Sequence, residues 1–179
     1  MREHIGIPGK TQVDVVMGTL GPRRSSPDFM PASLGNSILG QFGMMGRIGD
    51  VVREQAGLAY HASTDLSVSF VAGSWVVSAG VNPINLQRAI DLIVLELEKF
   101  IREPVTIEEL SDSQSYYIGR QQLTMESNGG VAGSLLNVER FQLGLDYYRQ
   151  YRHRVEAVTP EQILETAQKY IDPHRLAVV

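Results

Sequence analysis

Arg53 and Tyr60, seven residues apart, are two hydrogen-bond donors that the chain can bring to one place. A guanidinium offers several N–H donors in a rigid fork, and a phenol, whose reference pKa is about 10, keeps its proton at neutral pH. Arg53 falls near the end of a predicted short helix that Gly57 terminates, and Tyr60 falls at the start of the following strand. Both side chains can therefore point to one edge of a sheet.

Each of these residues also has a purely structural explanation. Tyr60 has the same parity as Leu66 and Phe70 along the predicted strand, which favours a tyrosine half-buried on the sheet unless a β-bulge intervenes. Arg53 stands next to Glu54 and could form a solvated ion pair with it. From the residues alone, the structural explanations come first.

The four histidines do not have the spacing of metal ligands. His4, His61, His153 and His174 lie far apart in the sequence, and we expect each on the surface, with His61 the least typical because it falls on a polar strand face. The absence of cysteine excludes disulfides, thiol catalysis and Cys-based zinc sites. The chain is predicted to bind no metal or other cofactor itself.

A glycine occurs at every third position between the first predicted helix and the short one: Gly40, Gly43, Gly46 and Gly49. A glycine-rich turn that opens a helix can hold a phosphate, but this one lacks the Lys-Ser/Thr of a P-loop and the G-x-G-x-x-G of a dinucleotide fold. Close approach between two packed backbones is the better interpretation.

The first half of the chain alternates as half-buried strands do. Strands are predicted at 12–19, 58–70 and 74–81, the last two joined as a hairpin, with apolar residues on one parity and small polar residues, including His61 and Ser63, on the other. The small side chains of the polar face would let an extended peptide lie close to it, and an edge strand could add backbone hydrogen bonds to such a peptide.

The second half is helical. Helices are predicted at 29–40, 48–52, 83–102, 106–125, from 128, and 159–171, and Leu176–Val179 resembles the start of a truncated final strand. Asn128 is the expected cap of its helix, with Val131, Leu135, Val138 and Leu143 facing inward. These elements predict an α+β two-layer domain, an antiparallel sheet with helices packed on its apolar face.

The composition fits one globular domain over residues 1–179. A net charge of −4 provides no broad basic surface for nucleic acid, and the cluster of Arg149, Arg152, His153 and Arg154 beside Tyr147–Tyr151 fits the exposed face of an amphipathic helix. No 18-residue apolar run or signal peptide is visible, so we expect a soluble chain, with the cytoplasm favoured, that contacts no membrane.

Residues 46–60, G-R-I-G-D-V-V-R-E-Q-A-G-L-A-Y, resemble a signature of the pitrilysin-type zinc peptidases, which include insulin-degrading enzyme and mitochondrial processing peptidase. That pattern, S-R-L-F-x-x-I-R-E-K-x-G-L-A-Y, belongs to the non-metal domain of the family; Gly46 and Gly49 depart from it. Further blocks follow in the family order: I-P-G-K-T-Q, P-D-F-M, N-S-I-L-G, V-T-I-E-E-L, V-T-P-E-Q-I and K-Y-I-D-P-H-R. The resemblance therefore covers nearly the whole chain.

The resemblance implies a processing-peptidase-like domain without the H-x-x-E-H motif that binds zinc in the partner domain. It implies that Tyr60 donates to the oxyanion of a bound peptide and that Arg53 holds substrate carbonyls, with His61 and Ser63 as further peptide contacts. The expected partners are a peptide and a homologous H-x-x-E-H domain, in cis or in trans, that carries Zn²⁺; a homodimer is possible. Residues 1–179 would then be the excised C-terminal half of a longer two-domain peptidase.

Two other interpretations stay open at this stage. The family also includes core subunits of a respiratory complex, so the chain could be a scaffold subunit without peptidase activity. An unrelated α+β binding module would be favoured if no homologous domain preceded this one. Retention of both Arg53 and Tyr60 favours the peptidase interpretation.

Overall fold

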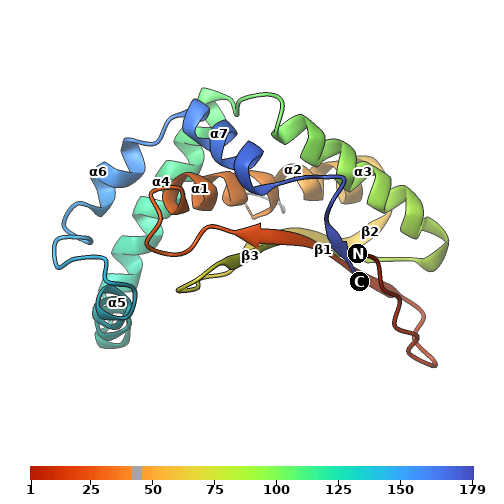
Figure 1. Cartoon of the computed structure of the whole chain (residues 1–179), viewed down its shortest axis with the longest axis horizontal. Coiled ribbons are helices and arrows are strands. Elements are labelled where there is room, and N and C mark those ends of the chain that lie inside the picture. The colour runs from red at the N-terminus through yellow and green to blue at the C-terminus, as the bar shows by residue number, and fades with distance from the viewer. Residues whose placement is uncertain (42–45) are drawn as a thin grey trace.

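The chain forms two layers, a curved antiparallel sheet with helices over one face (Figure 1). The computed structural model describes residues 1–41 and 46–179. The sheet has the strand order β2-β3-β1-β4, and its strands are β1 (Val13–Gly21), β2 (Ala59–Leu66), β3 (Gly73–Val81) and β4 (Ala177–Val178). The predicted α+β two-layer class is confirmed.

The helices come from both halves of the chain. Their bounds are Phe29–Gly40 (α1), Gly46–Gly49 (α2), Asp50–Gln55 (η1, a π-helix), Pro83–Asn85 (η2, a 3₁₀ turn), Leu86–Phe100 (α3), Ile107–Met125 (α4), Asn128–Phe141 (α5), Tyr151–Glu156 (α6) and Pro160–Tyr170 (α7). Among the described residues no helix is both long and apolar enough to cross a membrane.

The register of the sheet separates a buried face from an open one. The row Val15, Ala79 and Ala62 faces the helices and is buried, whereas the next row along the sheet faces away from them and pairs Val16 with Ser78 and Ser63. Successive residues of a strand point to opposite faces, so the alternation seen in the sequence creates this division. The open face curves away from the helices, as Figure 1 shows.

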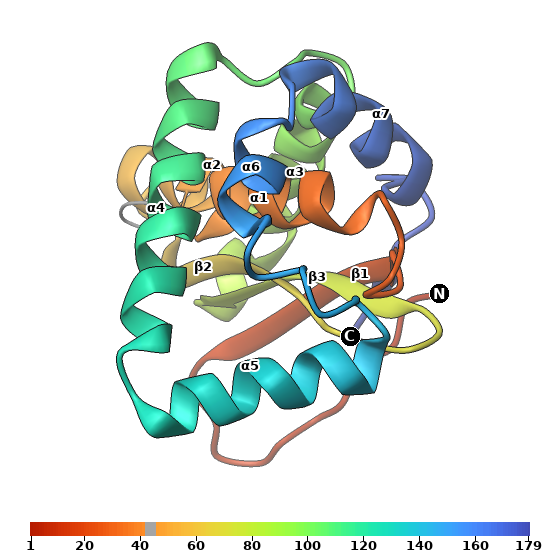
Figure 2. The ribbon, with the colours of Figure 1, turned by 90° about the vertical axis from the view of Figure 1, so that its left-hand side faces the viewer.

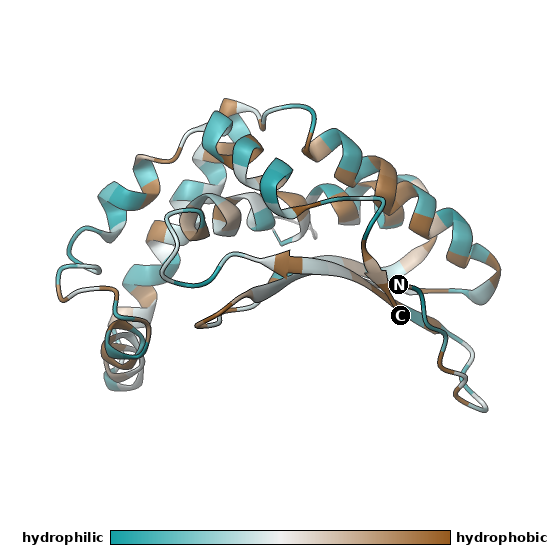
Figure 3. Cartoon of the chain, in the orientation of Figure 1, coloured by the Kyte–Doolittle hydropathy of each residue, from teal (hydrophilic) through white to brown (hydrophobic). Residues whose placement is uncertain are grey.

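Local sequence signals set most helix starts. Asn82 accepts a hydrogen bond from the backbone N–H of Ile84 at 3.1 Å, and Thr106 and Thr159 each form a capping box. Apolar and polar residues alternate around α3, as its colouring in Figure 3 shows, because one side of this helix faces the sheet.

The glycines after α1 allow close backbone contact, as predicted. A Cβ added to Gly46, whose φ is +64°, would lie 2.6 Å from the backbone nitrogen of Gly40, and one on Gly40 would overlap Thr64. Only glycine combines the positive φ of position 46 with the absence of a Cβ that this close contact requires. Phe42 and Gly43, which continue the same sequence pattern, lie outside the described residues.

Predictions about two of the elements were wrong. The second strand ends at Leu66, not Phe70, and Val68 and Phe70 are exposed on the connection to β3. In α5 the N-cap is Ser127, which accepts from the N–H of Gly130 at 3.0 Å, and the side chain of Leu135 is 62% exposed. Since α5 lies beside the open side of the sheet (Figure 2), its periodic apolar residues do not all have a core to face.

The tyrosine-rich segment packs as expected of an amphipathic element. Tyr147 is buried, and Tyr151 is half-buried. Burial raises the pKa of the Tyr151 phenol, which keeps that group neutral. Arg152 points outward and pairs with Glu156 at 2.8 Å. The tyrosines therefore form no exposed stacking surface of the kind that nucleic acids use.

Candidate functional site

Arg53 is carried by the π-helix η1. At the end of this element the N–H of Gly57 donates to the carbonyl of Arg53 at 3.0 Å, and the N–H of Leu58 donates to the carbonyl of Val52 at 3.0 Å. Gly57 has a φ of +64°, a left-handed conformation that glycine adopts without strain, so it ends the helix and turns the chain into β2. Short π-helical segments occur often at functional sites.

The Arg53 guanidinium has little to hold it. Its side chain is 37% exposed, and its Nε lies 3.5 Å from a carboxylate oxygen of Glu54, which is also exposed. An ion pair between two exposed neighbours contributes at most about 1 kcal/mol. The predicted Arg53–Glu54 pair therefore exists, but it is weak enough for the guanidinium to exchange it for another acceptor.

Tyr60 sits at a break in the register of the sheet. Ala59 pairs with Val81 and His61 pairs with Gly80, so no residue of β3 lies opposite Tyr60. A bulge inserts one residue into a strand and turns a side chain to a new direction. Without it Tyr60 would face the helices with Ala62; with it Ala59 takes the buried position and Tyr60 is 82% exposed. The half-buried tyrosine of the structural explanation is not found.

His61 and Ser63 face the open side of the sheet, next along the strand from Tyr60. A Cβ on Gly80 would lie 2.6 Å from Cε1 of His61, so the glycine lets the imidazole lie against the backbone of β3. Ser63 is in register with Ser78. The structure thus brings Tyr60, His61 and Ser63 together on β2, with Arg53 on the helix that leads into this strand.

The strand β2 is at an edge of the sheet, but this edge is partly covered. The side-chain amide of Gln41 donates to the carbonyl of Thr64 at 3.2 Å, and the hydroxyl of Thr64 donates to the carbonyl of Asn36 at 3.0 Å. The expected backbone pairing with an added peptide strand is therefore blocked at Thr64. The first residues of β2, near Tyr60, remain the better place for it.

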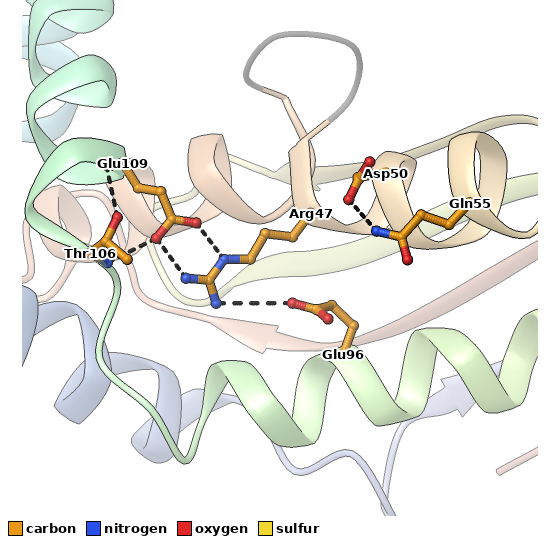
Figure 4. Close-up of polar contacts among 6 residues, drawn as sticks. All are labelled: Arg47, Asp50, Gln55, Glu96, Thr106 and Glu109. Carbon is orange, nitrogen blue, oxygen red and sulfur yellow. Dashed lines mark hydrogen bonds and ion pairs between the residues drawn. The ribbon is translucent and has the colours of Figure 1, made fainter.

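Arg47, six residues before Arg53, is held far more firmly (Figure 4). Its Nε and one terminal nitrogen donate to the two carboxylate oxygens of Glu109, each at 2.6 Å. Glu109 also accepts the backbone N–H of Thr106 at 2.8 Å, which starts α4. Burial alone would raise the pKa of the Glu109 carboxyl, but its bonds to Arg47 and Thr106 lower that pKa to about 2. This ion pair ties α2 and η1 to α4.

A second carboxylate approaches the same guanidinium from α3. A carboxylate oxygen of Glu96 lies 3.9 Å from the other terminal nitrogen of Arg47, too far for a hydrogen bond (Figure 4). Burial raises the pKa of the Glu96 carboxyl, and the nearby Lys99 and Arg47 offset this only in part. Arg47 lies in the motif of residues 46–60, but sequence patterns do not reveal its partners because Glu96 and Glu109 are distant in the chain.

No group of three or more His, Asp or Glu side chains is placed to hold a metal ion within residues 1–41 and 46–179. The Nε2 of His174 lies 3.3 Å from a carboxylate oxygen of Glu98, and His61 lies on the open sheet face. Arg53, Tyr60, His61 and Ser63 are thus hydrogen-bonding groups on an open surface, which suits contacts to the backbone of another molecule.

Comparison with known families identifies the chain. Residues 3–117, which run from the N-terminus into α4 and include Arg53 and Tyr60, match the family described as "Peptidase M16 inactive domain". The chain belongs to this family. No curated protein sequence matches it. The predicted resemblance to the non-metal domain of pitrilysin-type zinc peptidases is confirmed.

Solved structures share the fold of this M16 inactive domain. One is a peptidase M16 inactive domain from Pseudomonas fluorescens, 24% identical over 99% of this chain and 42% of that chain, with a TM-score of 0.91. Another is an inactive peptidase domain from Bordetella parapertussis, 20% identical over 98% and 92%, with a TM-score of 0.82. A chain of complex III2 from Candida albicans is 11% identical over 99% and 43%, with a TM-score of 0.79.

These likenesses extend the common fold to the whole domain. The family match stops at residue 117, whereas the structural matches include the helices α5 to α7 and the final strand. This chain spans about two fifths of the P. fluorescens chain (42%) but nearly all of the B. parapertussis one (92%). The same fold thus occurs both within a longer chain and as most of a shorter one.

Proposed function

We propose that this M16 inactive domain binds peptide for a zinc metallopeptidase, with Arg53 and Tyr60 facing a zinc site on a partner domain. The observation that carries the proposal is the bulge at Tyr60, which leaves this residue 82% exposed at the start of an edge strand. A bulge disrupts the pairing of the strand, and exposing an aromatic ring leaves apolar surface in water, so this arrangement calls for a functional reason. In a family of peptidase domains, contact with substrate is a reason for it.

The partner proposed here is a homologous domain with the H-x-x-E-H motif, in the same chain or in a second subunit. The P. fluorescens chain is more than twice as long as the part that this domain covers, which leaves room for a second domain of similar size. Residues 1–179 would then be the C-terminal, substrate-binding half of a longer peptidase. Zn²⁺ bound by the partner would supply the activated water for hydrolysis.

The contribution of this chain would be to hold the peptide and stabilise charge. The O–H of Tyr60 would donate to the scissile carbonyl oxygen as negative charge develops on it, an effect worth ~10² to 10³ in rate for a single positioned donor. The fork of Arg53 would donate to neighbouring peptide carbonyls and keep the substrate in register. His61 and Ser63, on the open face beside Tyr60, would contact the peptide farther along β2.

The test uses the complete peptidase with its H-x-x-E-H domain. Tyr60→Phe removes one hydroxyl, and we expect kcat to fall ~10²-fold or more, with zinc content unchanged. Tyr148→Phe is the matched control, because the Tyr148 ring contacts the rings of Tyr147 and Tyr151, far along the chain from β2. Equal turnover of Tyr60→Phe and wild type would remove Tyr60 from the mechanism.

A scaffold subunit without peptidase activity is the second candidate. The observation that favours it is the shared fold with a chain of C. albicans complex III2. A scaffold has no need of a free phenol and guanidinium at one edge, so Tyr60→Phe and Arg53→Gln would leave assembly unchanged. A coding region upstream of residue 1, or in a neighbouring reading frame, that encodes H-x-x-E-H would favour the peptidase; its absence would favour the scaffold.

A further inference from the structure

A second polar region lies at the opposite end of the sheet from Tyr60. Tyr60 adjoins the row of Asp14 and Gly80, whereas Arg24 follows the other end of β1, three residues after Gly21. At about 3.3 Å per residue along a strand, these two ends are roughly 25 to 30 Å apart. Whatever binds near Arg24 therefore does not share the groups of the Arg53–Tyr60 site.

The region contains a cavity of about 510 Å³ between the start of α1, the turn after α5 and the loop between α6 and α7. This volume is in the range of sites for small molecules. Two of its lining residues, Arg24 and Arg154, are cationic, and none is acidic. Its remaining polar groups are neutral and come from Ser25, Ser26, Gln142, Gln162 and Tyr147.

Both arginines are held on one tyrosine ring. The guanidinium carbons of Arg24 and Arg154 lie 4.9 and 5.3 Å from the ring centroid of Tyr147, which is buried. Arg24 also donates to the Tyr147 hydroxyl at 2.8 Å and lies 4.5 Å from the ring centroid of Phe29. A guanidinium fixed by stacking loses little freedom when it binds an anion, so the site is organised in advance.

The surroundings of the two positive charges are a further feature of the cavity. Among the residues that the structure describes, neither Arg24 nor Arg154 forms an ion pair, and Arg154 has only the amide oxygen of Gln150 at 3.1 Å. Two carboxylates that are close to these arginines in the sequence are paired with other cations: Asp28 with Lys169 at 2.7 Å and Glu156 with Arg152 at 2.8 Å. Two cations held on one ring repel each other, and a bound anion would relieve that repulsion.

We propose that this cavity binds a small organic anion, with a carboxylate or phosphate head group between Arg24 and Arg154. A planar fork pairs well with either head group. The rest of the lining is apolar and includes Phe29, Met30, Pro31, Leu143, Ala157 and Val158. The cavity is larger than a bare oxyanion, so the ligand carries an apolar body that rests on these side chains.

Gln142 supports this assignment. It is the only non-glycine residue with a positive φ (52°) among the described residues, at a helix end where glycine is the usual and less strained choice. A glycine there would satisfy the backbone but would remove an amide group from the rim of the cavity. Retaining a side chain at that cost is reasonable if the amide contacts a ligand.

The test titrates the 179-residue chain with four probes at constant ionic strength: phenyl phosphate, phenylacetate, inorganic phosphate and acetate. NMR spectra of the backbone and of the arginine Nε–H groups report binding. We expect saturable shifts at residues 24, 142–147 and 154, with each phenyl compound binding more tightly than its bare head group. The tighter of the two phenyl compounds identifies the head group as phosphate or carboxylate.

Substitutions locate the site. Arg154→Gln changes an exposed side chain and should weaken binding of the phenyl probe roughly tenfold or more, because it removes a charged hydrogen-bond donor. Arg152→Gln is the matched control: it removes the same charge two residues away, on a side chain turned toward Glu156, and should change the affinity less than about twofold. Arg24→Lys, which keeps the charge but not the fork, should also weaken binding.

Three results would overturn the proposal. The absence of saturable shifts for every probe would show that the two arginines are only structural. Equal weakening by Arg154→Gln and Arg152→Gln would reduce the effect to general electrostatic attraction. Equal affinity for phosphate and phenyl phosphate, and for acetate and phenylacetate, would overturn the apolar part of the site.

Discussion

Two arginines on one helical segment are in opposite situations. Arg47, on α2, has a side chain that is 17% exposed and donates two 2.6 Å hydrogen bonds to Glu109. Arg53, on η1, is 37% exposed and has only a 3.5 Å contact with its neighbour Glu54. The first guanidinium is used within the fold, and the second is left available to another molecule.

This contrast shows how an exposed side chain, such as the Arg53 that we propose to bind substrate, can be placed accurately. A donor that must meet a substrate cannot be fixed by strong contacts of its own, because the substrate would have to replace them. Its position must come from the backbone that carries it. Here the ion pair of Arg47 with Glu109 fixes one end of the segment against α4, and the hydrogen bond between Gly57 and the carbonyl of Arg53 fixes the other.

The largest expected effect is on the free energy of unfolding, when the ion pair of Arg47 with Glu109 is removed. Arg47→Met should lower the free energy of unfolding by about 3 kcal/mol, because Glu109 would keep a partly buried charge without its partner. Arg53→Met should change it by no more than about 0.5 kcal/mol, since its contact is exposed. Urea unfolding of the two variants and the wild-type chain, followed by circular dichroism, measures both.

Similar losses in both variants would contradict the comparison, because Arg53 would then be a structural residue as well. A loss below about 1 kcal/mol in Arg47→Met would show that the bidentate pair contributes little and that packing alone fixes α2. In the complete enzyme, Arg53→Met should weaken the binding of peptide although the protein stays folded.

The sequence predicted the elements better than their surroundings. The capping boxes at Thr106 and Thr159 are local, so they marked the starts of α4 and α7 correctly. The inward face expected for α5 was wrong at Leu135, because periodicity shows that a helix has an apolar side but not what lies next to that side. The position of α5 beside the open side of the sheet is set by long-range packing.

The sequence identified the residues of the candidate site, but it did not predict their orientation or their neighbours. Arg53 and Tyr60 were named from a motif, yet the strand alternation alone placed Tyr60 toward the helices. The bulge that turns it outward depends on which of Ala59 and Tyr60 fits opposite Val81, and no glycine or proline within β2 itself marks it. The pairing of Arg47 with Glu109 joins residues 62 positions apart, a contact that a single sequence does not reveal.

The stability contributed by the ion pair of Arg47 with Glu109 should depend on pH. The pKa of Glu109 is about 2 in the folded chain and 4.5 as its reference value. Because the folded pKa is lowered, this carboxylate stabilises the fold fully above about pH 4.5, and that contribution is lost as the pH falls toward 2. Allowing for solvent screening, we expect a loss of about 1 to 2 kcal/mol over this range.

The measurement is urea unfolding at a series of pH values, for the wild-type chain and for Glu109→Gln. The difference in stability between the two should shrink as the pH falls through this window, since protonation makes the wild-type residue neutral as well. A difference that stays constant from pH 6 to pH 2.5 would show that the charge of Glu109 does not stabilise the fold.

The smallest expected effect comes from the other carboxylate that faces Arg47. Glu96 lies 3.9 Å from the guanidinium without a hydrogen bond, and its burial raises the pKa of its carboxyl, so ionising it in the folded chain costs free energy. Glu96→Gln removes that cost together with a weak attraction, so at pH 7 stability should change by less than about 1 kcal/mol in either direction. Glu109→Gln, a change of the same size on the other side of the same guanidinium, should cost about 2 kcal/mol. Equal losses in the two variants would mean that Arg47 is held by the summed charge of its surroundings; unequal losses would place the anchor in the two short bonds to Glu109.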